Sequence, residues 1–242
     1  MNKSNVRFAP WVGLNYERGF CGLRILLVCE SHYAGKKHER PTVTPEIVKA
    51  LALGERHPRA TGKLPRHKHF TLIMSAVQNV RQRFSDTQRR EFWNSVAYYN
   101  FLQEFLQGSR VAPPAGVWQR SEKAFTEVLA VLAPDLIICF SLRNGNRIRS
   151  LAGSVPVAVV NHPSSRFTYS KVKPVIAKHI EMAQLLKTQA PKFVSSVLFY
   201  RWLEATASAL PTPGSHLSES DKIAILAERR ESMTALDEFI LM

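Results

Sequence analysis

The chain has 242 residues, 45% of them hydrophobic, which is enough for one sizeable α/β domain with its own core. The 33 Lys and Arg residues exceed the 19 Asp and Glu residues, and the net charge of +14 favours a polyanionic partner, most commonly nucleic acid. An ordinary basic soluble protein is the alternative on charge alone. Three scattered cysteines exclude a disulfide framework, and no apolar run is long enough to cross a membrane. With no apolar signal segment at the N-terminus, we expect a reduced, cytoplasmic protein.

Four short apolar runs predict buried β-strands. They cover residues 25–28, 96–99, 136–140 and 155–160. Their hydrophobicity is continuous rather than alternating, which is typical of parallel strands covered on both faces. Pro156 lacks a backbone N–H, so the last strand is expected to begin there or to lie at an edge of the sheet.

Helical patterns separate these runs. Ser121 is placed to cap a helix over 121–133, which Pro134 ends. Pro174 fits the first turn of another helix, and Pro45 with Thr44 opens a third that continues to residue 53. The alternation of strands and helices predicts a three-layer αβα fold around a four-stranded, mainly parallel sheet.

A basic insertion is expected over about residues 35–90. Within it, residues 54–69 combine five Lys and Arg with three His, two Pro and two Gly, and they predict a mobile basic loop. That loop is either a solvated insertion or an arm that contacts phosphates. His67 and His69 have no neighbouring thiol or carboxylate in sequence, so we expect no metal site and no cofactor.

The pattern changes past residue 190. One helix is predicted over about 192–210 and a second from Ser218, with a Pro- and Gly-containing link between them. We therefore expect an α/β domain over 1–190 and a C-terminal helical extension over 191–242.

Polar residues follow each predicted strand. In an open parallel sheet the loops beyond the carboxyl ends of the strands form the binding crevice, so these side chains are expected to converge. Each of them taken alone is more typical of a helix cap or a turn. A carboxylate and a histidine in one cleft would supply an acid/base pair, and an asparagine would suit the edge of a base. The residues are Glu30, Ser31, His32, Tyr33, Asn100, Ser141 and His162.

The ordered set of motifs resembles the uracil-DNA glycosylase superfamily, in particular its thermophilic branch. The resemblance covers residues 24–188, apart from the basic insertion. It rests on Cys29-Glu30-Ser31-His32-Tyr33 after the first strand, Asn100 after the second, Pro113-Pro114, Pro134-Asp135-Leu136-Ile137-Ile138, and His162-Pro163-Ser164.

The resemblance implies a role for each matched residue. His162 would stabilise negative charge on the departing base, while Glu30, with Ser31, would position water or stabilise the cationic sugar. Asn100 would read the base edge, with Tyr33, His32 and Ser141 completing the pocket. The residues implied to contact DNA are Ser164, Ser165, Arg166, Phe167, Tyr169, Lys171 and Arg143, with Phe167 as the wedge that fills the space of the flipped base.

The chain departs from the family at three points. Ser31 stands where the most active uracil enzymes have Asp, His32 replaces the family Pro, and Cys29 replaces the first Gly. Three cysteines cannot supply the four cluster ligands of the thermophilic branch, so no iron–sulfur centre is expected.

The expected activity is that of a monomeric, monofunctional DNA glycosylase that flips out and excises uracil or a phage-type hypermodified pyrimidine, in base-excision repair or antiphage defence. One alternative is a nucleic-acid-binding protein that has kept the fold and lost catalysis. A hydrolase of free nucleosides or nucleotides is another.

Overall fold

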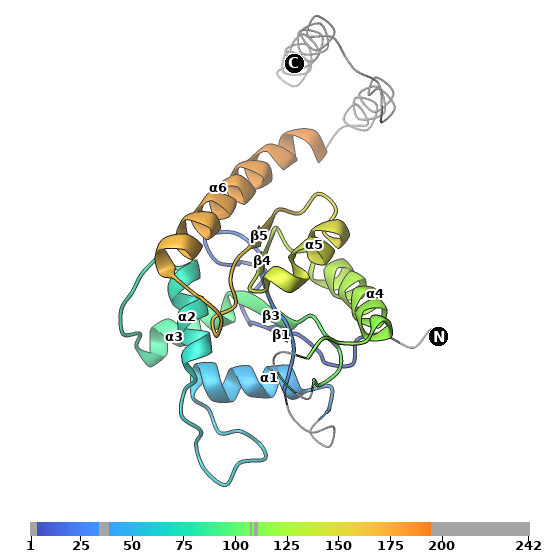
Figure 1. The fold of residues 1–242 in the computed structure, drawn as a ribbon. Coiled ribbons are helices and arrows are strands. Elements are labelled where there is room, and N and C mark those ends of the chain that lie inside the picture. The colour runs from blue at the N-terminus through green and yellow to red at the C-terminus, as the bar shows by residue number, and fades with distance from the viewer. Residues whose placement is uncertain (1–3, 34–38, 107, 109–110, 195–242) are drawn as a thin grey trace, which may run out of the picture. The chain divides into compact units, whose positions relative to one another are not determined.

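The structure is a computed structural model that describes residues 4–33, 39–106, 108 and 111–194 (Figure 1). The chain divides after Leu185, and residues 1–185 form one compact unit. Every site discussed below lies in that unit.

A five-stranded sheet forms the centre of the fold, in the order β1-β3-β2-β4-β5. β2 (Ile25–Cys29), β3 (Val96–Asn100), β4 (Leu136–Cys139) and β5 (Val157–Val159) are parallel to one another. The short β1 (Trp11–Val12) is antiparallel to β3 at one edge. β2, β3 and β4 are buried throughout, as expected of strands that are covered on both faces.

Helices cover both faces of this sheet (Figure 1). One face packs against η2 (Val48–Leu53), α2 (Lys68–Val77), α3 (Asp86–Asn94) and the first part of α6 (Tyr169–Val194). The other packs against α4 (Ala115–Leu132) and α5 (Leu142–Leu151). The mixed α/β, three-layer architecture expected from the sequence is therefore confirmed.

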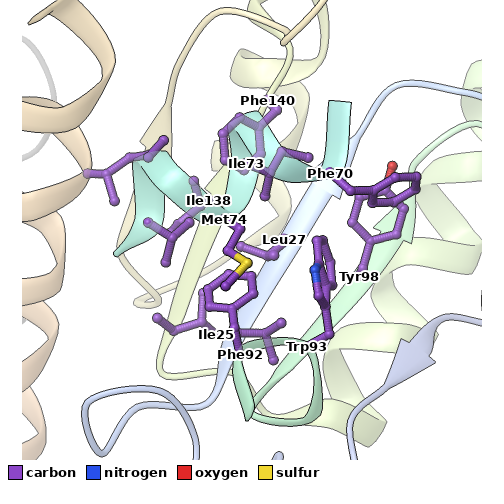
Figure 2. Close-up of a cluster of buried hydrophobic side chains, with 14 of the residues drawn as sticks. Ile25, Leu27, Phe70, Ile73, Met74, Phe92, Trp93, Tyr98, Ile138 and Phe140 are labelled. Atoms are coloured by element: carbon purple, nitrogen blue, oxygen red, sulfur yellow. The ribbon is translucent and has the colours of Figure 1, made fainter. Parts of the chain in front are cut away.

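The side-chain alternation of the strands decides which face each residue serves. Ile25 and Leu27 of β2 point to the α2 face, where they pack with Ile73 and Met74 (Figure 2). Leu26 and Val28 point to the α4 face. This alternation continues past the ends of the strands and determines which polar residues meet.

Two of the predicted boundaries and the strand count were wrong. The sheet has a fifth strand, β1, at its edge. The sequence did not predict it because β1 is only two residues long and has no pattern of its own. Ser121 does not cap a helix: α4 begins at Ala115, and the buried Ser121 hydroxyl accepts a hydrogen bond from the Gln103 N–H at 3.1 Å. Pro174 lies in the second turn of α6, which begins at Tyr169.

The region expected as a basic insertion builds much of one layer. It contains α1 (Val43–Ile47), η2, α2 and α3, which bring large apolar side chains such as Phe70 and Trp93 into the core (Figure 2). Gly54 ends η2 with a left-handed φ of +74°, a conformation that glycine adopts without a steric penalty. Residues 54–67 then connect η2 to α2 without regular secondary structure.

The two C-terminal helices predicted from residue 192 onward fall mostly outside the described residues, which end within α6. None of the helices in the described part of the chain combines the length and apolar character needed to span a lipid bilayer.

Candidate functional site

A cavity of about 1500 Å³ opens at the carboxyl ends of the parallel strands. Its wall comes from the loop after β2, the end of β3, the start of α2 and the segment from β5 to α6. This is the crevice that the strand order predicts, and it exceeds the 300–1000 Å³ that is typical of small-molecule pockets. The polar and aromatic residues lining it include Ser31, His32, Tyr33, His69, Tyr98, Asn100, His162, Ser164, Arg166, Phe167 and Tyr169.

Asn100 and His32 form a buried pair on the cavity wall. The Asn100 side-chain nitrogen lies 3.1 Å from His32 Nε2, which is also 2.9 Å from the Thr44 hydroxyl. Phe8 and Phe105 pack against the His32 ring, and burial lowers the pKa of His32 to about 4. The His32 ring is therefore neutral at physiological pH and fixes the orientation of the Asn100 amide.

Tyr98 and Asn100 both line the cavity, and burial raises the pKa of the Tyr98 phenol well above its ordinary value. The Asn100 amide nitrogen faces His32, so the side-chain carbonyl oxygen is the group that can accept a hydrogen bond from a ligand.

His162 follows β5 and is held by Ser164. The Ser164 N–H donates to His162 Nδ1 at 3.2 Å, and the Ser164 hydroxyl lies 2.7 Å from the same nitrogen. Both contacts with Ser164 use Nδ1, so the other ring nitrogen, Nε2, remains available to a ligand. Burial lowers the pKa of His162, so the imidazole is neutral in this setting.

Glu30 is directed away from this cavity. Cys29 lies on the α2 face of the sheet, so by alternation the next residue turns toward α5. Glu30 forms an ion pair with Arg143 at 2.9 Å and accepts a hydrogen bond from the Ser141 hydroxyl at 3.1 Å. The same hydroxyl caps α5 by accepting from the Asn144 N–H. Glu30, Ser141 and Arg143 thus form a cluster of their own, and none of them lines the cavity.

The residues expected to contact DNA divide between the cavity wall and the surface. Ser164, Arg166, Phe167 and Tyr169 line the cavity, whereas Ser165 and Lys171 are exposed beside it. Phe167, the expected wedge, is partly buried against the hydrophobic core and meets Tyr169 edge-on at 5.5 Å between ring centroids. In this position Phe167 forms part of the wall.

The cavity wall is basic. Lys68, Arg81 and Arg166 line it, and none of its described lining residues is acidic. Two cations approach the Tyr169 ring, with the Arg81 guanidinium 5.7 Å and the Lys173 ammonium 5.2 Å from its centroid. Cation–π contacts of this kind hold positive charge at the cavity wall, where it would attract an anionic ligand.

His69, Tyr98 and Cys29 belong to the site, although the sequence indicated none of them as partners. His69 Nε2 lies 3.2 Å from the Tyr98 hydroxyl and 3.6 Å from Cys29 Sγ, and the His69 and His162 rings are 5.1 Å apart. Burial, with His162 nearby, lowers the pKa of His69 to about 3, and burial raises the pKa of the Cys29 thiol well above its usual range. His69 was considered in sequence only beside His67, because nothing local connects it to residues 40 and 93 positions away.

No protein-family model matches this chain, and no curated protein sequence is significantly similar to it.

Proposed function

We propose that this chain is a DNA glycosylase of the uracil-DNA glycosylase type, which accepts an extruded base in the cavity and hydrolyses its N-glycosidic bond. The observation that carries the proposal is the convergence of Asn100 and His162 on one basic cavity. The net charge of +14 supports a DNA partner. We further propose that the protein acts as a cytoplasmic monomer in base-excision repair or antiphage defence.

Cleavage of the N-glycosidic bond needs a hydrogen-bond donor beside the departing base. When the glycosidic bond breaks, its electron pair leaves with the base and negative charge develops on a base oxygen. With Nδ1 accepting the Ser164 N–H, the neutral His162 ring carries its proton on Nε2, and this N–H can donate a hydrogen bond to that oxygen. A preorganised donor of this kind contributes on the order of 2.7–4 kcal/mol to transition-state stabilisation.

Recognition of the base is assigned to Asn100. Its carbonyl oxygen accepts a hydrogen bond from an N–H on the base edge, and the His32 contact holds it in place. Tyr33, with 44% of its surface exposed, and Phe167 offer aromatic walls for stacking. Water then adds its oxygen to the sugar carbon, and the proton that it releases passes to the anionic base, which leaves an abasic site and the free base.

A second candidate function is DNA binding without catalysis. It is favoured by one observation: Glu30 lies outside the cavity lining, and the described lining residues contain no other carboxylate to stabilise the cationic sugar or activate water. Such a protein would bind extruded bases without cleaving them.

One experiment separates these functions. The protein is incubated with uracil-containing DNA and with naturally hypermodified phage DNA, abasic sites are cleaved with alkali, and the released base is identified by mass. Abasic sites that form with the native protein and disappear with His162→Ala support the glycosylase. Retention of both DNAs without any released base identifies the binding protein. Cleavage of free nucleosides, with DNA binding that changes little with salt, would point to a nucleoside hydrolase instead.

A further inference from the structure

Three side chains of types that bind metals meet at the cavity wall, and they come from separate elements. Cys29 ends β2, His69 lies in the first turn of α2, and His162 follows β5. One potential ligand atom from each lies within 4.8 Å of the other two. A thiol and two imidazoles that are far apart in sequence therefore share one point in space.

The spacing suits a tetrahedral ion. Zn–S and Zn–N bonds of about 2.3 and 2.0–2.1 Å place neighbouring ligand atoms roughly 3.5 Å apart. Cys29 Sγ and His69 Nε2 are already 3.6 Å apart. Drawing in the remaining ligand atom takes a shift of about 1 Å, which rotation of a partly exposed histidine ring such as that of His162 provides.

The contact that Ser164 makes with His162 is also typical of a metal-binding histidine. Ligating histidines almost always donate their other ring N–H to a fixed partner. When Nε2 binds the ion, the ring proton moves from Nε2 to Nδ1, where the Ser164 hydroxyl, 2.7 Å away, can accept it. At His69, Nε2 faces both the Cys29 thiol and the Tyr98 hydroxyl, although one nitrogen can accept only one of these protons well.

We propose that Cys29, His69 and His162 bind one Zn²⁺ ion, with a fourth coordination position open to the cavity. A mixed thiolate and imidazole set favours zinc over the hard cations, which prefer oxygen ligands. His69 and His162 line the cavity while Cys29 lies behind them, so a bound ion would face the cavity. Three protein ligands with one open position are typical of catalytic rather than structural zinc sites.

The metal site does not depend on the glycosylase proposal. Where that proposal holds, the ion would occupy the place of the His162 N–H donor and polarise an oxygen of the base as a Lewis acid. The sequence had predicted no metal because His69 was compared with its neighbour His67 rather than with Cys29 and His162.

The test uses Co²⁺ as a spectroscopic probe for the full chain after treatment with a chelator, followed by Zn²⁺ competition and elemental analysis. Cobalt bound to a thiolate gives a charge-transfer absorption that histidine-only sites lack. Native protein should bind one equivalent of Co²⁺ and show this absorption. Cys29→Ser should abolish this absorption. His162→Ala and His69→Gln should weaken cobalt binding by more than about tenfold, which is the lower end of the loss seen when a residue that only hydrogen-bonds a metal ligand is removed.

The chain offers matched cysteine controls. Cys139→Ser removes a buried thiol from the neighbouring strand β4, on the other face of the sheet, and Cys21→Ser removes an exposed one. Both should bind cobalt like the native protein. The proposal is overturned if native protein shows no thiolate absorption, if the absorption survives in Cys29→Ser, or if it is lost in Cys21→Ser instead. Should Cys29→Ser fail to fold by circular dichroism, unchanged affinity in the two histidine variants would reject the site. Metal content is the readout, so a protein without glycosylase activity can still pass this test.

Discussion

Cys29 and Glu30 are consecutive in the chain, yet their side chains lie on opposite faces of the sheet. Cys29 packs toward α2 and approaches His69, whereas Glu30 pairs with Arg143 beside α5. The period-two alternation of a strand therefore separates the thiol near the cavity from the carboxylate that the first motif places next to it.

The first prediction follows from this separation. His162→Ala removes the proposed donor to the base and should lower the rate of base excision about 10²–10³-fold. Glu30→Gln should lower it far less, because this carboxylate contacts Ser141 and Arg143 rather than the cavity. Single-turnover assays on the preferred DNA measure both rates. An equal loss in the two variants would show that Glu30 reaches the sugar when DNA binds, and would contradict the division of the site described above.

The fold was predictable from sequence where burial leaves a strong pattern. The continuous apolar runs of β2 and β4 identified a parallel sheet, and the polar residues after the strands correctly indicated the edge where the cavity lies. The two-residue β1 could not be found, because a segment of that length has no periodicity.

The composition of the site was harder to predict. The first predicted strand ended at residue 28, whereas β2 continues to Cys29. The alternation of the strand therefore reaches Cys29 and Glu30 and places their side chains on opposite faces of the sheet. His69 reaches the site through α2, whose position depends on tertiary packing of Ile73 and Met74 against the sheet (Figure 2). No local sequence signal records contacts of that kind.

The second prediction concerns Arg166, which lines the cavity and has a left-handed φ of +50°. Arg166→Gly should preserve or raise the unfolding free energy, by up to about 1 kcal/mol, because glycine adopts this conformation without the Cβ clash. It should also weaken DNA binding and reduce the slope of log K against log salt by about 1. Arg166→Lys retains the charge and should restore the slope. Fluorescence anisotropy at several salt concentrations measures this slope. An unchanged slope in the glycine variant would show that Arg166 does not contact DNA.

The third prediction concerns stability in acid. The Arg40 guanidinium beside Glu46, with a further hydrogen bond from Thr42, lowers the pKa of that carboxyl from 4.5 to about 2. His57 also faces it, at 3.6 Å. A lowered pKa means that the folded state favours the ionised form, so the stabilisation is complete above about pH 4.5 and is lost as the pH falls toward 2.

Glu46→Gln should therefore be less stable than the native protein at pH 6, and the difference should shrink steadily between pH 4.5 and pH 2. Urea denaturation at several pH values measures it. Glu91→Gln, which changes an exposed carboxylate on α3, is the control. A difference that stays constant with pH would assign the effect of the Glu46 variant to packing rather than to ionisation.

The last prediction tests whether α2 is an integral part of the core. Ile73 is fully buried against the sheet and lies one helical turn after His69 on the same side of α2. Ile73→Ala leaves a cavity there and should lower the unfolding free energy by about 2–5 kcal/mol. Val131→Ala, at a position in α4 with 81% of its surface exposed, should change it by no more than about 0.5 kcal/mol. If α2 were a loosely attached part of an insertion, both variants would unfold at nearly the same urea concentration. A large difference between them would instead show that the helix carrying His69 is held by the same packing that buries β2, and that the cavity has a rigid wall on this side.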